Sequence, residues 1–256
     1  MILYFSGTGN SRLVAEKLAG LTKDQIHNLE QGAPPKMQDG ETLILVAPLY
    51  FWALPSLVLS FLKKHQELNR KELHVVMTCG GALGAGASFI TRQLRGLGFQ
   101  EVYVHALIMT TNYIPLHRVQ RKEVAEKAVQ AALNRLPEIA EDIRQKRGAP
   151  TSSFLAKALP IYQGMYDRAR QTRRFYATNK CVGCGKCERD CPSQAIHLIN
   201  GYPRWDKPQC ALCLRCLHRC PQAAIEHGKG TVGKERYHPE KFLLENARIK
   251  SSQKGI

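Results

Sequence analysis

Two copies of one cysteine pattern constrain this chain more than any other feature of its sequence. Residues 181–192 read CVGCGKCERDCP and residues 210–221 read CALCLRCLHRCP, so both runs follow the spacing CxxCxxCxxxCP. The match continues beyond the cysteines, with CPSQAI at 191–196 and CPQAAI at 220–225. We interpret the segment as a half-unit that has been duplicated into one small domain.

The spacing of the cysteines favours iron-sulfur clusters. In such a run the first three thiolates bind one [4Fe-4S] cluster, while the fourth binds the other cluster. Four thiolates also suit zinc, but zinc sites usually pair two CxxC arms and need neither a third cysteine nor the proline that follows here. The first predicted ligand set is Cys181, Cys184, Cys187 and Cys220. The second predicted set is Cys210, Cys213, Cys216 and Cys191.

These runs closely resemble the bacterial two-cluster ferredoxin, over about a fifth of the chain. The resemblance implies a small α+β domain over residues 179–228 that passes single electrons. Apolar side chains near the cysteines would then shield the clusters and help to set their potential: Val182, Ile196, Leu212 and Ile225. A purely structural role for the clusters is the alternative, although two adjacent clusters in one small fold form a conducting pair.

The first 148 residues alternate apolar runs with segments of helical periodicity, which predicts an α/β domain with helices on both faces of a parallel sheet. Five strands are expected, at residues 2–5, 25–29, 43–47, 73–77 and 102–109. The expected helices cover residues 11–21, 55–65, 85–97 and, as one long helix, 119–147.

A glycine-rich turn, SGTGNS, lies between the first strand and the first helix, where backbone N–H groups can bind a phosphate. Its residues are Ser6, Gly7, Thr8, Gly9, Asn10 and Ser11. The turn resembles the flavodoxin phosphate loop, and it lacks the Gly-Lys-Ser/Thr ending of a P-loop. The resemblance implies a doubly wound, flavodoxin-like fold that binds FMN at the carboxyl ends of its strands.

The flavodoxin resemblance assigns two further loops to FMN, PLYFWALP at 48–55 and TCGGALGAG at 78–86. The expected contacts are Pro48, Leu49, Tyr50, Phe51, Trp52, Thr78, Cys79, Gly80, Gly81 and Gly84. Which of the three aromatic residues stacks on the flavin stays open, and core or interface packing is their alternative. Asn112 and Tyr113 could touch the flavin or the ferredoxin-like domain. Cys79 and His105 are expected to pack rather than react.

Half of the net charge of +16 lies in residues 144–180, which contain nine Lys or Arg and one Asp. Residues 149–178 are expected to form a basic connecting segment with a helix at 154–176, and residues 229–256 a polar tail. The charge suggests an acidic redox protein as partner, with a merely solvated helix as the alternative.

Both domains in this order resemble fused flavodoxin-like and ferredoxin-like proteins of anaerobes, sometimes described as EFR-family ferredoxins. The resemblance implies electron transfer between FMN, two [4Fe-4S] clusters and an external partner. A flavin-dependent reductase of a quinone or nitro compound is the alternative, while a nucleic-acid-binding redox sensor and a peripheral membrane module rank lower. No nicotinamide fingerprint is present, since SGTGNS is not GxGxxG. Without a signal-like start or a membrane-length apolar run, a cytoplasmic location is expected.

Overall fold

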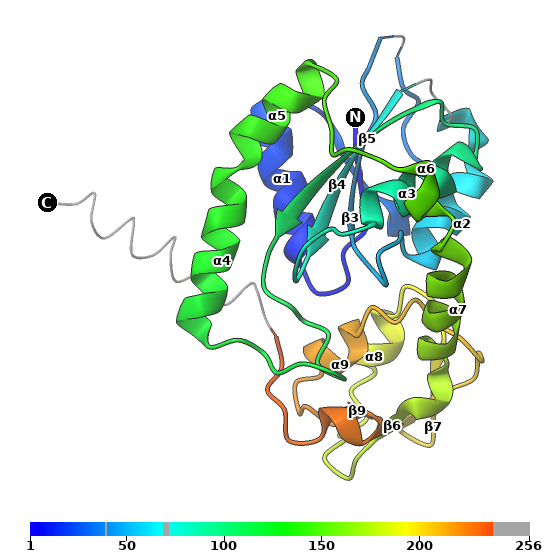
Figure 1. Cartoon of the computed structure of the whole chain (residues 1–256). Coiled ribbons are helices and arrows are strands. Elements are labelled where there is room, and N and C mark those ends of the chain that lie inside the picture. The colour runs from blue at the N-terminus through cyan, green and yellow to red at the C-terminus, as the bar shows by residue number, and fades with distance from the viewer. Residues whose placement is uncertain (39, 69–71, 238–256) are drawn as a thin grey trace, which may run out of the picture.

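Five parallel strands form the larger sheet, in the order β2-β1-β3-β4-β5. The computed structural model describes residues 1–38, 40–68 and 72–237 (Figure 1). The strands are β1 (Ile2–Tyr4), β2 (Ile26–Asn28), β3 (Ile44–Pro48), β4 (Glu72–Cys79) and β5 (Glu101–Ile108). From β1 the chain adds β2 on one side of the sheet and then β3, β4 and β5 on the other side. A ligand crevice is therefore expected between β1 and β3, outside their carboxyl ends. The predicted flavodoxin-like α/β fold is confirmed.

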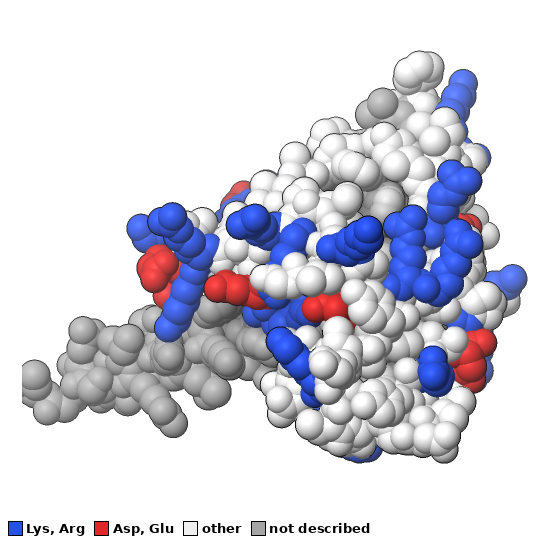
Figure 2. Space-filling view, turned by 90° about the horizontal axis from the view of Figure 1, so that it is seen from below, with Lys and Arg blue, Asp and Glu red and all other residues white. Residues whose placement is uncertain are grey.

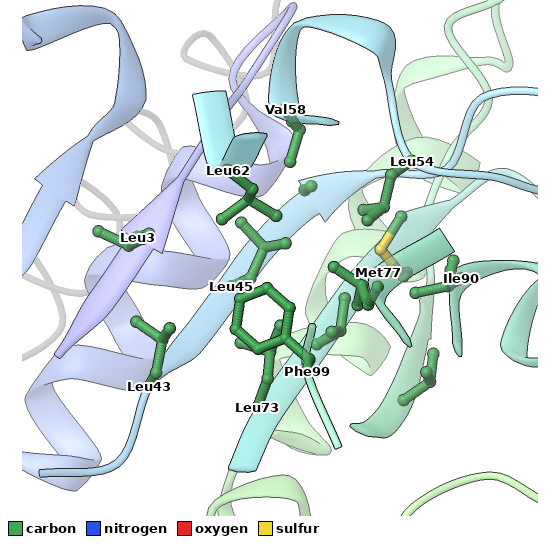
Figure 3. Close-up of a cluster of buried hydrophobic side chains, with 14 of the residues drawn as sticks. Leu3, Leu43, Leu45, Leu54, Val58, Leu62, Leu73, Met77, Ile90 and Phe99 are labelled. Atoms are coloured by element: carbon green, nitrogen blue, oxygen red, sulfur yellow. The ribbon is translucent and has the colours of Figure 1, made fainter. Parts of the chain in front are cut away.

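Helices cover both faces of this sheet. On one face α1 (Asn10–Thr22), α4 (Lys122–Asn134) and α5 (Leu136–Arg144) bury apolar side chains against the strands. On the other face lie α2 (Ser56–Lys64) and α3 (Gly86–Arg95). Figure 3 shows the core on this second side, where Leu45, Leu73 and Met77 of the sheet meet Leu62, Ile90 and Phe99. Helices on both faces leave the strand ends as the open edges of the domain.

The C-terminal unit is small and built from short elements. Its two antiparallel pairs join β6 (Phe175–Ala177) to β9 (Ile225–His227) and β7 (Ile196–Ile199) to β8 (Tyr202–Trp205). Each cysteine run contributes one short helix, α8 (Lys186–Arg189) or α9 (Arg215–Arg219). These helices and strands give the unit the expected α+β, ferredoxin-like character.

Two predicted helices are wrong in extent. The helix expected at 119–147 is interrupted at Arg135, because Pro137 lies in the first turn of α5 and cannot continue the hydrogen bonding of α4. The helix expected at 154–176 is divided into α6 (Ser153–Ala156) and α7 (Leu159–Ala169), where Pro160 begins a new helix. Its last residues form a 3-10 turn (Thr172–Arg174) and then β6, because Phe175–Ala177 pairs with β9.

The two units share a hydrophobic core. Ile114, from the loop after β5, and Tyr166 of α7 pack with Leu212, Leu214 and Leu217 of the second cysteine run. In Figure 1, α7 runs alongside both units, with the C-terminal unit below the sheet. The first part of the expected polar tail packs as well, since Tyr237 is 1% exposed. The rest of that expectation, residues 238–256, lies outside the described residues. No helix in the described part of the chain has the length and apolarity needed to span a bilayer.

Candidate functional site

A cavity of about 650 Å³ lies at the carboxyl edge of the sheet. It is within the size range of cavities that hold cofactor-sized ligands. Every residue that we predicted as a flavin contact lines it, except Gly9. The turn after β1, the loop after β3 and the loop after β4 therefore meet around one space, as expected for an open α/β sheet.

The turn after β1 leads into α1 through a glycine N-cap that offers no side chain to the first N–H groups of the helix. Gly9 has a φ of 124°, which other residues rarely adopt, and it precedes α1 without a capping side chain. The Ser6 hydroxyl accepts a hydrogen bond from the Gly9 N–H at 3.1 Å. The Ser11 hydroxyl bonds that of Thr78 at 2.8 Å, which joins the turn to β4. The start of α1 has no acidic residue, so its dipole and N–H groups suit a phosphate.

The aromatic loop after β3 is a tight turn closed by two hydrogen bonds between the backbones of Tyr50 and Ala53, each 3.0 Å long. Both central residues, Phe51 and Trp52, have positive φ, at 49° and 60°. Such values are costly for large side chains and often occur at functional sites. Phe51 packs against Tyr113 and Tyr166, while Trp52 contacts Tyr162 and stays 41% exposed.

The glycine-rich loop after β4 lies close to two neighbours. A Cβ on Gly80 would lie 2.7 Å from the Thr111 side chain, and one on Gly84 would lie 3.2 Å from the Trp52 indole nitrogen.

Cys79 is buried, its thiol points to the Leu107 carbonyl at 3.6 Å, and burial raises its pKa. A protonated, buried thiol is a poor nucleophile, in agreement with the packing role expected for Cys79.

The first predicted thiol set surrounds a small hollow in the C-terminal unit. All four of its cysteines line this hollow, together with Pro203 and Ile225: Cys181, Cys184, Cys187 and Cys220. Burial, aided by the neighbouring thiols of Cys220 and Cys181, raises the pKa of Cys187 to about 11. Cys184 is exposed, so one side of this set faces the outside of the protein.

The second predicted thiol set lies deeper. Burial raises the pKa of Cys210 to about 12 and that of Cys216 well above its ordinary value, and the thiols of Cys213 and Cys191 add to both shifts. Cys191 comes from the first run, so the structure brings the predicted crossing ligand to the second set. Thiolates held this close in an apolar site repel one another unless bound iron compensates their charge.

Both sets suit clusters in their donor chemistry. Within the described residues, no group of three or more His, Cys, Asp or Glu side chains is arranged to hold a single metal ion. A [4Fe-4S] cluster takes one thiolate on each of four irons, so its ligands are spread around a cube rather than gathered on one ion.

The sequence did not predict the far wall of the cavity. Leu212, Cys213 and Leu214 of the C-terminal unit line it directly. Six residues that follow β5 also line the cavity, and the sequence offers only Asn112 and Tyr113 among them as candidates: Thr110, Thr111, Asn112, Tyr113, Leu116 and His117. Their position after a strand was the only available signal. No local pattern marks Cys213 as a neighbour of the turn after β1.

Comparison with known families accounts for both units. Residues 1–125 match the family described as flavodoxin domain, and residues 180–226 match the family described as 4Fe-4S dicluster domain. The chain joins a flavodoxin domain to a 4Fe-4S dicluster domain. The two matches support an electron-transfer function, and they suggest flavin and 4Fe-4S clusters as the cofactor classes of the two domains.

Individual relatives match one part of the chain or are distant. A subunit of the ion-translocating oxidoreductase complex of Methanosarcina acetivorans is 44% identical over 46 residues, which cover 18% of this chain and 17% of that protein. A ferredoxin-type protein FwdE of Methanocaldococcus jannaschii is 22% identical over 139 residues, covering 54% of this chain and 90% of the relative. An uncharacterized protein of the same organism is 40% identical over 47 residues, or 18% of each chain. The match to the first and third of these thus spans less than a fifth of their length.

Proposed function

We propose that this protein passes electrons between FMN, bound in the cavity of the flavodoxin domain, and an external redox protein, by way of two [4Fe-4S] clusters. Bound FMN supplies two-electron chemistry that can be divided into single-electron steps, and each cluster carries one electron. The chain contributes the phosphate loop, two thiol sets and a fixed contact between the domains.

One observation carries this proposal: Cys213, a predicted cluster ligand, lines the same cavity as the phosphate loop. A Cβ on Gly7 of that loop would lie 2.8 Å from the Cys213 carbonyl oxygen and 3.2 Å from its Cβ. The second thiol set is thus adjacent to the proposed flavin site, and the first set reaches the outer surface at Cys184. This supports an order of flavin, second cluster, first cluster and partner.

Tyr50 lines the cavity beside Cys213 of the second thiol set. Its hydroxyl would lie 2.9 Å from a Cβ on Gly7, and its ring packs against Tyr166 with centroids 6.2 Å apart. Burial, with the nearby Cys213 thiol, raises its pKa well above 10, so the phenol stays protonated. The half-buried, neutral ring of Tyr50 takes up space beside the phosphate loop that water would otherwise fill.

The proposed partner is an acidic redox protein that docks near the first thiol set. Lys and Arg side chains outnumber Asp and Glu on the face seen from below in Figure 2. The charged stretch of residues 144–180 ends at Lys180, next to Cys181. Four of its cationic side chains near this end are exposed: Arg168, Arg173, Arg174 and Lys180. Exposed apolar side chains at Val182, Ile199 and Tyr202 offer contact area beside them. Reduced thiol ligands suit a cytoplasmic location.

A reductase of a small quinone or nitro compound is the second candidate. The cavity is lined by Leu116, whose side chain is 74% exposed, so it opens to solvent beside that residue. A planar acceptor could enter there and meet the flavin. Turnover with a soluble quinone, at a rate comparable to the reduction of a protein partner, would favour this candidate.

Anaerobic purification followed by quantification of cofactors tests the main proposal. We expect one FMN and about eight iron and eight sulfide per chain, the content of two [4Fe-4S] clusters. A stepwise redox titration should then resolve separate flavin and cluster transitions. Stoichiometric zinc in place of iron, or a protein that does not bind FMN, would contradict the proposal.

A further inference from the structure

Arg215 lies between two predicted ligands of the second cluster, yet its side chain points into the flavodoxin domain. It is 8% exposed. Its Nε donates to the Gly7 carbonyl at 3.1 Å, and its Nη2 donates to the Ser6 carbonyl at 2.7 Å. The same guanidinium forms a two-pronged ion pair with the Glu30 carboxylate, at 2.6 and 2.5 Å.

All five N–H groups of Arg215 have acceptors. The fifth bond runs from Nη1 to the Asp190 carbonyl at 3.0 Å, immediately before Cys191. One side chain thus joins the phosphate loop, the turn after β2 and the segment that carries the crossing ligand. Only a guanidinium offers five donors in a fixed plane, so lysine cannot replace these contacts.

The bonds to Ser6 and Gly7 fix the orientation of the phosphate loop. The peptide bonds of the described chain are trans, and a trans peptide points its N–H opposite to its C=O. Because Arg215 holds the carbonyls of Ser6 and Gly7, it also sets the direction of the N–H groups of Gly7 and Thr8. Both residues line the cavity, and in the described part of the chain neither N–H has a protein acceptor.

We propose that Arg215 is a positioning residue that couples docking of the dicluster domain to phosphate binding in the flavodoxin domain. The inference rests on the proposed function, because the phosphate is that of FMN. With the dicluster domain docked, Arg215 holds the loop in the orientation that receives the phosphate. FMN binding in turn favours the docked arrangement, since coupling between two binding events is reciprocal.

With this coupling, tight binding of FMN depends on the docked dicluster domain. An isolated flavodoxin-type loop would bind FMN without regard to the clusters. Here the two carbonyls that orient the loop are held from a residue more than 200 positions away in sequence. The protein thereby favours a flavin that has a cluster next to it over one that does not.

Titration of flavin-free, cluster-loaded protein with FMN and with riboflavin tests the proposal. Relative to the natural chain, Arg215→Gln should weaken FMN binding by about 10-fold or more. Riboflavin lacks the phosphate, and its affinity should change by less than about 3-fold if the residue acts through the loop. Equal losses for both ligands, or no loss for FMN, would overturn the proposal.

Two further variants separate the loop effect from damage to the clusters. Glu30→Gln removes the negative charge and one of the two oxygens that accept from the guanidinium, without altering the cysteine runs. It should weaken FMN binding in the same direction as Arg215→Gln. Arg215→Lys keeps the positive charge but loses the planar, two-pronged group of donors. It should bind FMN almost as weakly as the glutamine variant. Arg204→Gln, an exposed arginine of β8, is the matched control and should bind FMN as the natural chain does. Iron and sulfide content is measured for each.

Hydrogen–deuterium exchange of the flavin-free protein provides a readout that does not depend on FMN. We expect the amides of Gly9 and Leu13, which donate to the Ser6 hydroxyl and the Gly9 carbonyl, to exchange faster in Arg215→Gln and Glu30→Gln than in Arg204→Gln. Unchanged exchange would refute the positioning role even if the protein binds flavin. Faster exchange in a protein that binds no FMN would instead leave Arg215 as an orienting residue and refute the proposed function.

Discussion

At the residue scale, Gly7 is where the phosphate loop touches the dicluster domain. A Cβ at this position would lie 2.8 Å from the Cys213 carbonyl oxygen and 2.9 Å from the Tyr50 hydroxyl. We expect Gly7→Ala to push the loop away from Cys213, because overpacking of this kind costs about 1 to 3 kcal/mol. FMN affinity should fall by about 10-fold, and reduction of the clusters through the flavin should slow, as measured by fluorescence titration and stopped-flow absorbance.

Gly20→Ala is the matched control for this substitution. Gly20 lies within α1, and apart from its chain neighbours and the backbone of that helix its would-be Cβ has no atom within 4 Å. The change should raise the free energy of unfolding by about 0.5 to 1 kcal/mol, since alanine favours helix, and leave FMN affinity unchanged. If both alanine variants bound FMN equally well, contact at Gly7 would not matter for the flavin site.

The cysteines and the phosphate loop could be predicted from sequence because their partners are close in the chain. Three thiols of each set fall within seven residues, and the loop is six residues long. The contacts between the domains are different in kind. Arg215 meets Gly7 across 208 positions, and the Tyr237 hydroxyl donates to Asn10 across 227 positions. Nothing in the local periodicity around Arg215 or Tyr237 indicates what lies opposite them.

At the scale of elements, neighbouring strands β4 and β5 place two histidines in the sheet. The Nδ1 of His74 lies 3.4 Å from the Nε2 of His105, and both side chains are buried. Burial, together with the His74 ring and Arg135, lowers the pKa of His105 to about 4, against a smaller opposing effect of Asp142. Burial also lowers the pKa of His74, although Glu72 opposes that shift. Both rings are therefore neutral in the folded protein near pH 7.

Acidification should destabilise the flavodoxin domain through these strands. The unfolded chain binds protons at its histidines below about pH 6.5, while folded His105 resists protonation until about pH 4. The free energy of unfolding is thus highest above pH 6.5 and falls as the pH drops toward 4, by about 2 kcal/mol at pH 5 for His105 alone. Urea unfolding of the natural chain at pH 7.5 and 5 measures this loss.

His105→Gln retains a polar side chain toward His74 and removes the titrating group. Its unfolding free energy should fall less between pH 7.5 and 5 than that of the natural chain. His27→Gln, on the outer strand β2, should keep the full pH dependence. A His105→Gln variant with the same loss as the natural chain would mean that other groups control acid stability.

The strands themselves were easier to predict than the helices. Continuous apolar runs identify β3 and β4, and even the weak run at residues 25–29 forms β2. The helical spacing of apolar residues does not indicate where the backbone hydrogen bonding of a helix ends. The sequence therefore predicts one continuous helix across Arg135. The same spacing also does not indicate that Phe175–Ala177 pairs with β9, about fifty residues later in the chain. This pairing makes the end of the expected basic helix the strand β6.

At the scale of the whole molecule, charge and the path between the centres point to the same face. The exposed cations of the basic segment lead to the first thiol set, which is the one farther from the flavin cavity in the proposed order. An acidic partner would be steered to this face and dock beside Cys184. Opposite charges on two proteins accelerate encounter, and salt screens them over about 10 Å at 0.1 M.

The rate of reduction by an acidic flavodoxin, used as a probe partner, should therefore fall steeply with ionic strength. Replacing Arg173, Arg174 and Lys180 together by glutamine should lower the second-order rate constant about 10-fold at low salt and flatten its salt dependence. The triple variant of Lys17, Lys64 and Lys127 removes the same charge from exposed positions on α1, α2 and α4. Its second-order rate constant should fall much less, because the local patch around Arg173, Arg174 and Lys180, and not the net charge of the protein, guides docking. Equal losses in both variants would make the attraction a property of overall charge, and a rate indifferent to salt would remove steering altogether.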